Sequence, residues 1–210
     1  MNQLIINAFA DESAPDLAGQ IDALKRNGLQ GLEIRNVDGR NIVDIPANEI
    51  REIGKALSDN GLKVWSIGSR LGKIQITDDF APHLEECKRT LEIAHMLGAA
   101  YIRLFSFYIP KDEQPASYRD EVLERLSKFL EASDGSGVKL CHENEKGIYG
   151  DIAARCLDIY ESLPSLGCIF DPANYIQCGQ DTEDAFRMLG DRVTYLHIKD
   201  ALPDGRIVPA

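Results

Sequence analysis

The sequence predicts an α/β fold in which parallel strands alternate with helices. Two observations indicate this fold. Short apolar runs alternate with amphipathic stretches, with a strand candidate about every 30 residues. Polar side chains also follow many of the apolar runs at the point where each run ends. Because strands that alternate with helices form βαβ units, we expect a parallel sheet.

The first half of the chain supplies four strands and four helices. The first helix has apolar residues at Leu17, Ile21 and Leu24, and it ends at Asn27-Gly28. Glycine also follows the second and third helices, and the third strand is rich in β-forming residues. After the first helix, the predicted helices are Ala47–Asn60, Asp78–Leu97 and Tyr118–Ala132, and the predicted strands are Leu4–Phe9, Gly31–Arg35, Lys63–Gly68 and Tyr101–Phe107.

The second half of the chain repeats the scheme. The stretch Asp134-Gly135-Ser136-Gly137 closes the fourth helix. The predicted strands that follow are Val138–Glu143, Gly167–Asp171 and Val193–Lys199, and the predicted helices between them are Asp151–Leu163 and Thr182–Leu189.

A closed barrel fits these elements better than an open doubly wound sheet. The first strand lacks the GxGxxG that would support a nucleotide-binding open sheet. In an eight-stranded barrel the carboxyl ends of all strands surround one site, whereas an open sheet uses only the few strands at its switch point. The polar strand ends that favour the barrel are Arg35, Ser69, Ser106, Glu143, Asp171 and His197.

The chain is shorter than a complete barrel. Its 210 residues compare with about 250 for a typical (β/α)8 TIM barrel. After the seventh strand, Asp200–Ala210 is predicted to be a loop. We therefore predict a single TIM barrel domain over residues 1–210, C-terminally incomplete, with the eighth β/α unit missing.

Composition excludes several classes of protein. The net charge of −11 argues against nucleic-acid binding, which needs clustered Lys and Arg. No apolar run approaches the roughly 18 residues of a membrane span, and the N-terminus lacks a signal peptide, so we expect a cytoplasmic protein. The five cysteines are odd in number and contain no CxxC pair, which predicts reduced, mostly buried thiols.

Three consecutive strands end in residues that ligate metals. Glu143 lies near the end of VKLCHEN, Asp171 ends GCIFD just before Pro172, and His197 shares one face of its strand with Lys199. Because the strands are neighbours, we expect these ends to meet. Two carboxylates and an imidazole suit one divalent Mn, Mg, Co or Zn ion and leave positions open for substrate.

Each of these residues also has a structural interpretation. Asp171 alone is typical of a helix cap, and His197 alone of a packed, hydrogen-bonded histidine. Glu143 alone could form a salt bridge with Lys146 or Arg103. The repetition of ligand-type residues at one place on three successive strands favours the metal site.

The sequence resembles the sugar phosphate isomerase/epimerase family, the xylose isomerase-like TIM barrels that are related to AP endonuclease family 2. The resemblance implies metal binding by a Glu, an Asp, a His and a final Glu. The first three correspond to Glu143, Asp171 and His197, whereas the fourth belongs to the missing eighth strand. Arg70 departs from the proline expected in a GSPxGK-like loop. The motifs are NAFADE (Asn7–Glu12), WSIGSRLGKI (Trp65–Ile74), LFSFYIP (Leu104–Pro110), CHENEKGIYGD (Cys141–Asp151), FDPANYIQCGQD (Phe170–Asp181) and YLHIKDA (Tyr195–Ala201).

Three further residues are candidates for substrate binding. Asn174 corresponds to the position at which a related epimerase subgroup places a substrate-contacting His. Lys199 could bind a substrate hydroxyl or phosphate, or pair with Asp200 on the surface. Arg103 could be an anion ligand or an internal ion-pair partner. The resemblance also suggests a homodimer.

These observations predict a metal-dependent isomerase or epimerase of a small sugar, sugar phosphate or polyol derivative. In this hypothesis Glu143 would be the catalytic base that removes a proton next to a carbonyl. The alternative is a non-catalytic sugar-binding or structural barrel, because the final Glu is missing. A metal-dependent hydrolase or endonuclease is the minor alternative, since its three-zinc site needs more ligands than a chain with four His offers.

Overall fold

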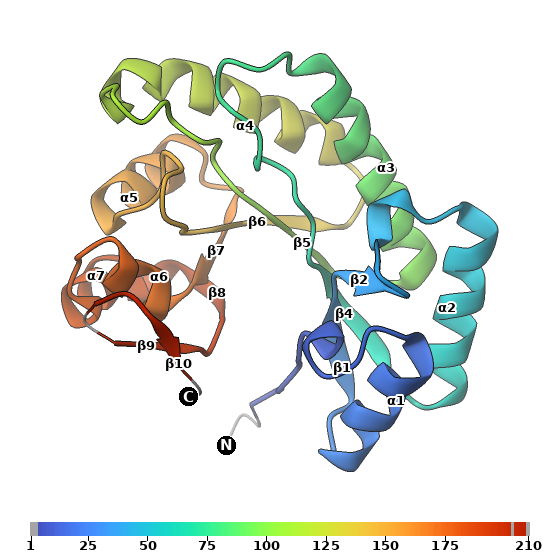
Figure 1. The fold of residues 1–210 in the computed structure, drawn as a ribbon. Helices are drawn as coiled ribbons and strands as arrows, with labels where there is room; N and C mark the ends of the chain where they lie inside the picture. Colours follow the sequence, from blue (N-terminus) through green and yellow to red (C-terminus); the bar gives the residue numbers. More distant parts are fainter. Residues whose placement is uncertain (1–3, 203, 209–210) are drawn as a thin grey trace. The chain divides into compact units, whose positions relative to one another are not determined.

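The computed structural model describes residues 4–202 and 204–208, drawn in Figure 1. The chain divides into two compact units, each described here by itself. Unit 1 comprises the chain up to Ser69 together with Glu86–Ile102 and Gly135–Val138. Unit 2 comprises Arg70–Glu85, Arg103–Asp134 and the chain from Lys139 onward.

Unit 1 is built on parallel strands flanked by helices. The strand order β1-β4-β5 follows the chain, and the register pairs Gly31 with Lys63 and Ser66 with Tyr101. All four residues of β1 are buried, as expected for a parallel strand covered on both faces. In Figure 1, α1 and α2 lie along β1 and β4. The elements are α1 (Leu17–Arg26), β1 (Gly31–Ile34), α2 (Ala47–Asp59), β4 (Lys63–Ile67), most of α3 (Ala81–Leu97) and the start of β5 (Tyr101–Leu104).

The first helix shows why the sequence forms these elements locally. Asp16 is the N-cap of α1, and its side chain accepts a hydrogen bond from the Gly19 N–H at 2.9 Å. Lys25 and Arg26 lie in the last turn, where positive charge is favourable. Gly28 follows with φ of 66°, a conformation that glycine adopts without strain.

Unit 2 carries the three remaining parallel strands. The order β6-β7-β8 again follows the chain, and the register pairs Glu143 with Ile169 and Ile169 with Tyr195. The strands β6 and β7 are almost wholly buried, whereas β8 is half-exposed. The elements are α4 (Arg119–Ser133), β6 (Lys139–Glu143), α5 (Ala153–Ser162), β7 (Gly167–Phe170), α6 (Pro172–Gln177), α7 (Thr182–Leu189) and β8 (Val193–Leu196).

A glycine in unit 2 is required by close packing. Gly72 has φ of 83°, and a Cβ atom there would lie 1.9 Å from the carbonyl oxygen of Phe105. The Gly72 N–H donates to Nε2 of the buried His83 at 2.6 Å. These two contacts fix the backbone conformation of the loop before α3 at Gly72.

Several predicted elements differ from the structure. Residues Leu4–Phe9 are not a strand: only Ala8 bridges to Leu32, and the apolar side chains before it are mostly exposed, so they bury little apolar surface. The predicted strand Tyr101–Phe107 stops at Leu104, and Phe107 has a positive φ of 64° that no strand allows. The predicted strand Val193–Lys199 likewise ends at Leu196.

The prediction that Asp200–Ala210 is a loop is wrong for the described residues. Asp200–Ala201 (β9) and Ile207–Val208 (β10) form an antiparallel pair, and Gly205 turns between them with φ of 85°. A second small pair, Asn36–Val37 (β2) with Arg40–Asn41 (β3), also escaped prediction. Residues 203, 209 and 210 lie outside the described part of the chain.

The state of the cysteines and the hydropathy of the helices can be compared with the expectations from composition. All five cysteines are free, and all but Cys178 are buried, as predicted. Among the described residues, no helix combines the length and the hydropathy that crossing a bilayer requires.

Candidate metal centre

The three predicted ligands come together in unit 2. Glu143 is the last residue of β6, Asp171 directly follows β7, and His197 directly follows β8. One ligand atom of each residue lies within 4.8 Å of the others. Glu143 and Asp171 are buried, and the side chain of His197 is 11% exposed. The three side chains therefore form one cluster in unit 2.

Glu143 is held by two positively charged or polar neighbours. His197 Nδ1 lies 2.9 Å from Glu143 Oε1 in a hydrogen bond. Arg103 Nη1 lies 3.2 Å from Glu143 Oε2, which makes the buried ion pair that the sequence left open. Glu143 Oε2 is buried and accepts no hydrogen bond from the described residues, so the contact with Arg103 is an ion pair alone.

Asp171 is held on both carboxylate oxygens. Its Oδ1 accepts a hydrogen bond from the Asn174 N–H at 3.1 Å, which makes Asp171 the N-cap of α6. Its Oδ2 lies 3.0 Å from Lys199 Nζ. Lys199 therefore pairs with Asp171, not with Asp200 as its surface interpretation supposed.

The pKa values of the Glu143 and Asp171 carboxyl groups shift in opposite directions. Burial alone raises the pKa of the Glu143 carboxyl, but the charges of His197 and Arg103 and the hydrogen bond from His197 outweigh burial and lower this pKa below its usual range. Burial raises the pKa of Asp171, and the charge of Lys199 offsets this only in part. Two adjacent acids with pKa values pushed apart are typical of functional sites.

Two observations indicate that Glu143, Asp171 and His197 could bind a divalent cation. The donor set of two carboxylates and one imidazole suits Mn, Mg, Co or Zn. Glu143 Oε2 is a buried acceptor that no hydrogen bond of the described residues satisfies. Ligands bound to one ion at about 2.1 Å lie at most about 4.2 Å apart, so the observed spread of up to 4.8 Å is close to that limit.

The three predicted substrate-binding residues lie beside this cluster. Arg103 contacts Glu143, and Lys199 contacts Asp171. Asn174 is buried, and its Oδ1 accepts a hydrogen bond from Lys199 Nζ at 2.9 Å. Their position next to the candidate ligands is observed, whereas their contact with a substrate stays a prediction.

Two groups near the cluster were missed or left unassigned by the sequence. Asn144 is fully buried and bonds to the backbone of Asp171. His142 lies in a buried network: its Nε2 is 2.9 Å from Ser106 Oγ and its Nδ1 is 3.2 Å from the Tyr160 hydroxyl. The sequence offered one indication of a role for Asn144: it is a polar residue directly after a predicted strand.

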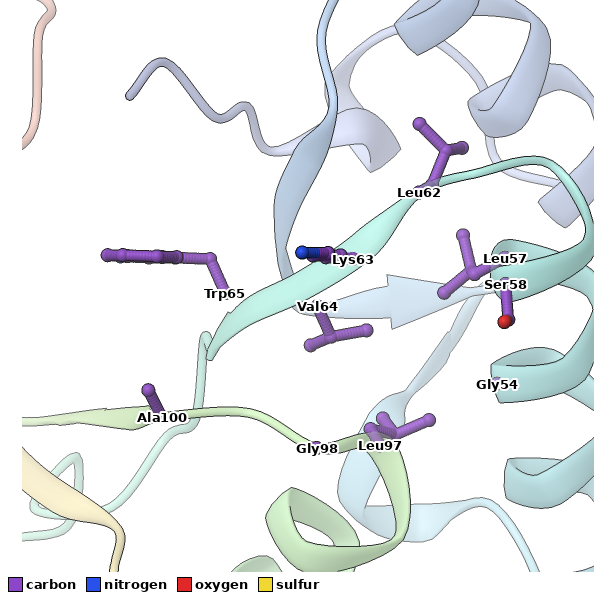
Figure 2. Close-up of a pocket in the computed structure, with 10 residues that line it drawn as sticks. All are labelled: Gly54, Leu57, Ser58, Leu62, Lys63, Val64, Trp65, Leu97, Gly98 and Ala100. Carbon is purple, nitrogen blue, oxygen red and sulfur yellow. The ribbon is translucent and has the colours of Figure 1, made fainter. Parts of the chain in front are cut away.

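Unit 1 contains a separate pocket of about 330 Å³. Figure 2 shows side chains of α2, β4 and the end of α3 around it. Lys63 is the one charged residue of its lining, and none of the lining residues belongs to the metal-ligand set. The lining residues are Gly54, Leu57, Ser58, Leu62, Lys63, Val64, Trp65, Leu97, Gly98 and Ala100.

Comparison with solved structures shows the fold. The chain is similar to the probable 3-DHS dehydratase AsbF of Bacillus anthracis (18% identity, TM-score 0.78, 94% of this chain and 74% of that chain). It is also similar to the 3-keto-D-glucoside 4-epimerase YcjR of E. coli (18% identity, TM-score 0.72, 92% and 78%). A third similar structure is the IOLI protein with a bound zinc atom (14% identity, TM-score 0.76, 96% and 76%). At these identities the likeness concerns the fold alone.

Among curated proteins, the chain is similar to an alanine racemase of Clostridium perfringens. The two are 29% identical over 116 residues, which is 51% of this chain and 29% of that protein. The chain thus spans less than a third of the length of this relative.

A family comparison covers most of the chain. The Xylose isomerase-like TIM barrel family matches residues 21–207. The predicted α/β fold of the TIM barrel type is confirmed, with six parallel strands among the described residues against eight in a complete barrel. The resemblance drawn from motifs such as FDPAN and HIKD is confirmed as well. The chain belongs to the Xylose isomerase-like TIM barrel family.

Proposed function

We propose that this chain carries the metal-binding and proton-abstracting residues of an isomerase or epimerase. Its substrate would be a small sugar, sugar phosphate or polyol derivative. The observation that supports the proposal is the convergence of Glu143, Asp171 and His197 within 4.8 Å at the ends of three consecutive parallel strands. In a parallel barrel, catalytic residues lie at these carboxyl ends.

A divalent ion held by these three residues would polarise a carbonyl and its neighbouring hydroxyl. Glu143 would then remove the proton from the adjacent carbon. In an isomerisation, the electron pair of that C–H bond would form an enediolate, and Glu143 would deliver the proton to the former carbonyl carbon while a proton moves between the two oxygens. An epimerisation would need a second acid on the opposite face of the substrate. The charges of His197 and Arg103 keep Glu143 ionised at neutral pH, so that its carboxylate can act as the base.

The names of similar proteins support the chemistry without choosing the substrate. One is a 4-epimerase, one a probable dehydratase and one a protein with bound zinc. One fold hosts many substrates, since loops and a few polar contacts select them.

The test measures metal content and proton exchange together. The purified chain is assayed by elemental analysis, and a panel of ketoses in D₂O is followed by proton NMR for exchange next to the carbonyl. We expect stoichiometric metal and exchange in the unaltered chain and loss of both in Glu143→Gln. The matched control is Glu145→Gln, since Glu145 pairs with Lys73 and is not a candidate ligand.

Two outcomes would contradict the proposal. Full exchange and metal content in Glu143→Gln would remove that residue from the site. Metal and sugar binding without any exchange would instead indicate a non-catalytic sugar-binding barrel.

A further inference from the structure

The buried Asn144 makes an unusual contact with a candidate metal ligand. Its Oδ1 accepts a hydrogen bond from the Asp171 N–H at 2.9 Å, and its Nδ2 donates to the Asp171 carbonyl oxygen at 3.0 Å. One side chain thus satisfies both backbone groups of Asp171.

This contact continues the ladder between two strands. Backbone pairing of β6 with β7 reaches Glu143, which is paired with Ile169. The strand β7 then ends at Phe170, and Pro172 cannot donate to a further ladder bond. The side-chain amide of Asn144 takes the place of a strand backbone at this point, so the spacing of Glu143 and Asp171 is fixed past the end of the sheet.

The network also reaches the carboxylate of Asp171. The Asn144 carbonyl oxygen accepts a hydrogen bond from Asn174 Nδ2 at 2.7 Å. The Asn174 backbone N–H in turn donates to Asp171 Oδ1, and Asn174 Oδ1 accepts a hydrogen bond from Lys199 Nζ. Backbone and side chain of Asp171 are therefore held by one connected set of buried amides.

We propose that Asn144 is a positioning residue that orients the Asp171 carboxylate toward Glu143 and His197 and thereby sets the affinity of the site for a divalent cation. The inference rests on the proposed function, in which these three residues bind the metal. An amide is required, because only a side chain with one donor and one acceptor matches the two backbone groups of Asp171. Partners that orient metal ligands in this way contribute strongly to metal affinity.

The test compares metal affinity with stability in matched variants. Mn²⁺ and Zn²⁺ are titrated calorimetrically into the unaltered chain, Asn144→Ala and Asn144→Asp, and thermal unfolding is followed for each. We expect both variants to bind about 10- to 100-fold more weakly. The control is Gln20→Ala in unit 1, because Gln20 is a buried amide that also bonds two backbone groups, the carbonyls of Pro15 and Asn36. It should lower the melting temperature and leave metal affinity unchanged.

The outcomes separate this inference from the proposed function. If the unaltered chain binds neither ion, the metal site itself fails and the inference fails with it. If the unaltered chain binds metal and the Asn144 variants bind it equally well, only the positioning role is wrong. Should Asn144→Ala not fold, Asn144→Asp decides, since it keeps the side-chain volume and the acceptor while removing the donor to the Asp171 carbonyl.

Discussion

One carboxylate from each unit shows how differently polar neighbours can satisfy such a group. In unit 1, Asp11 is bridged by Arg35 at 2.8 and 3.2 Å, and Asn36 donates to the same carboxylate at 2.7 Å. In unit 2, Glu143 keeps a buried oxygen that accepts no hydrogen bond from the described residues. A saturated carboxylate stabilises the fold, whereas a carboxylate with unused capacity can bind a cation or a proton.

The comparison also separates the six polar strand ends that the sequence grouped together. Arg35 is engaged by Asp11, and Ser106 by His142 and the Gly150 N–H. Both therefore have structural partners within their own unit. Glu143 differs from both, because its Oε2 accepts no hydrogen bond from the described residues.

The largest expected effect contrasts one carboxylate from each unit. Asp171→Asn should weaken metal binding by more than about 100-fold, because losing a partner outside the ligand set already costs about 10- to 100-fold. Asp11→Asn should leave metal affinity unchanged and lower the free energy of unfolding by about 1–2 kcal/mol, through weaker charge-assisted bonds to Arg35. Calorimetric metal titration and urea unfolding of both variants measure the two effects. Equal losses of metal affinity would break the distinction between the clusters.

The buried His142 of unit 2 should make the stability of the protein depend on pH. His142 is a strand residue of unit 2 whose partners, Ser106 and Tyr160, are all buried. Burial lowers the pKa of His142 from 6.5 to about 3, and the charge of Glu143 opposes this only weakly. Between these two pH values the unfolded chain binds a proton that the native chain does not, so this contribution to stability is complete above pH 6.5 and declines as the pH falls.

The resulting prediction concerns the slope of stability against pH. From pH 7.5 to pH 5, His142 should account for about 2 kcal/mol of lost unfolding free energy, at about 1.4 kcal/mol per pH unit below 6.5. Urea unfolding of the unaltered chain and of His142→Gln at both pH values measures this difference. Parallel pH profiles for the two proteins would show that His142 is protonated in the native state or is not buried.

The cluster of candidate ligands was predictable because it depends on local periodicity. Alternation along a strand and a stop at Pro172 were enough to place Glu143, Asp171 and His197 at strand ends. The sequence left open whether Asp171 is a helix cap or a ligand, and the structure shows that the cap does not exclude the cluster: Oδ1 caps α6 while the residue lies in the ligand set. The helix α6 itself was missed, although Asp before Pro is a recognised helix start.

Other features could not be predicted because they depend on contacts between distant residues. Asn144 bonds to a backbone 27 residues away, and no local pattern specifies that partner. The apolar run Leu4–Phe9 matches a strand in composition, yet only Ala8 finds a strand partner among the described residues. The hairpin β9–β10 did have a local indication, the Asp204-Gly205 pair, which is typical of a tight turn.

The smallest expected effect tests whether Lys199 opposes or supports the metal. Lys199 Nζ lies 3.0 Å from Asp171 Oδ2, where its charge competes with a cation for the same oxygen. Lys199→Met keeps the apolar stem and removes the charge, so we expect metal affinity to rise by less than about tenfold, since a partly exposed ion pair contributes about 1 kcal/mol or less. The control Lys63→Met removes a charge from the pocket of unit 1 and should change nothing at the metal site.

The sign of the change in metal affinity in Lys199→Met distinguishes two roles for this lysine. Tighter binding of Mn²⁺ to Lys199→Met would mean that lysine neutralises Asp171 only until a cation replaces it. Weaker binding would mean that Lys199 helps to orient the carboxylate, because it also donates to Asn174 in the network around Asn144. If binding is weaker, the positioning role extends from Asn144 to Asn174 and Lys199. If binding is tighter, it stays with the backbone contact of Asn144, and Lys199 remains available for a substrate hydroxyl or phosphate.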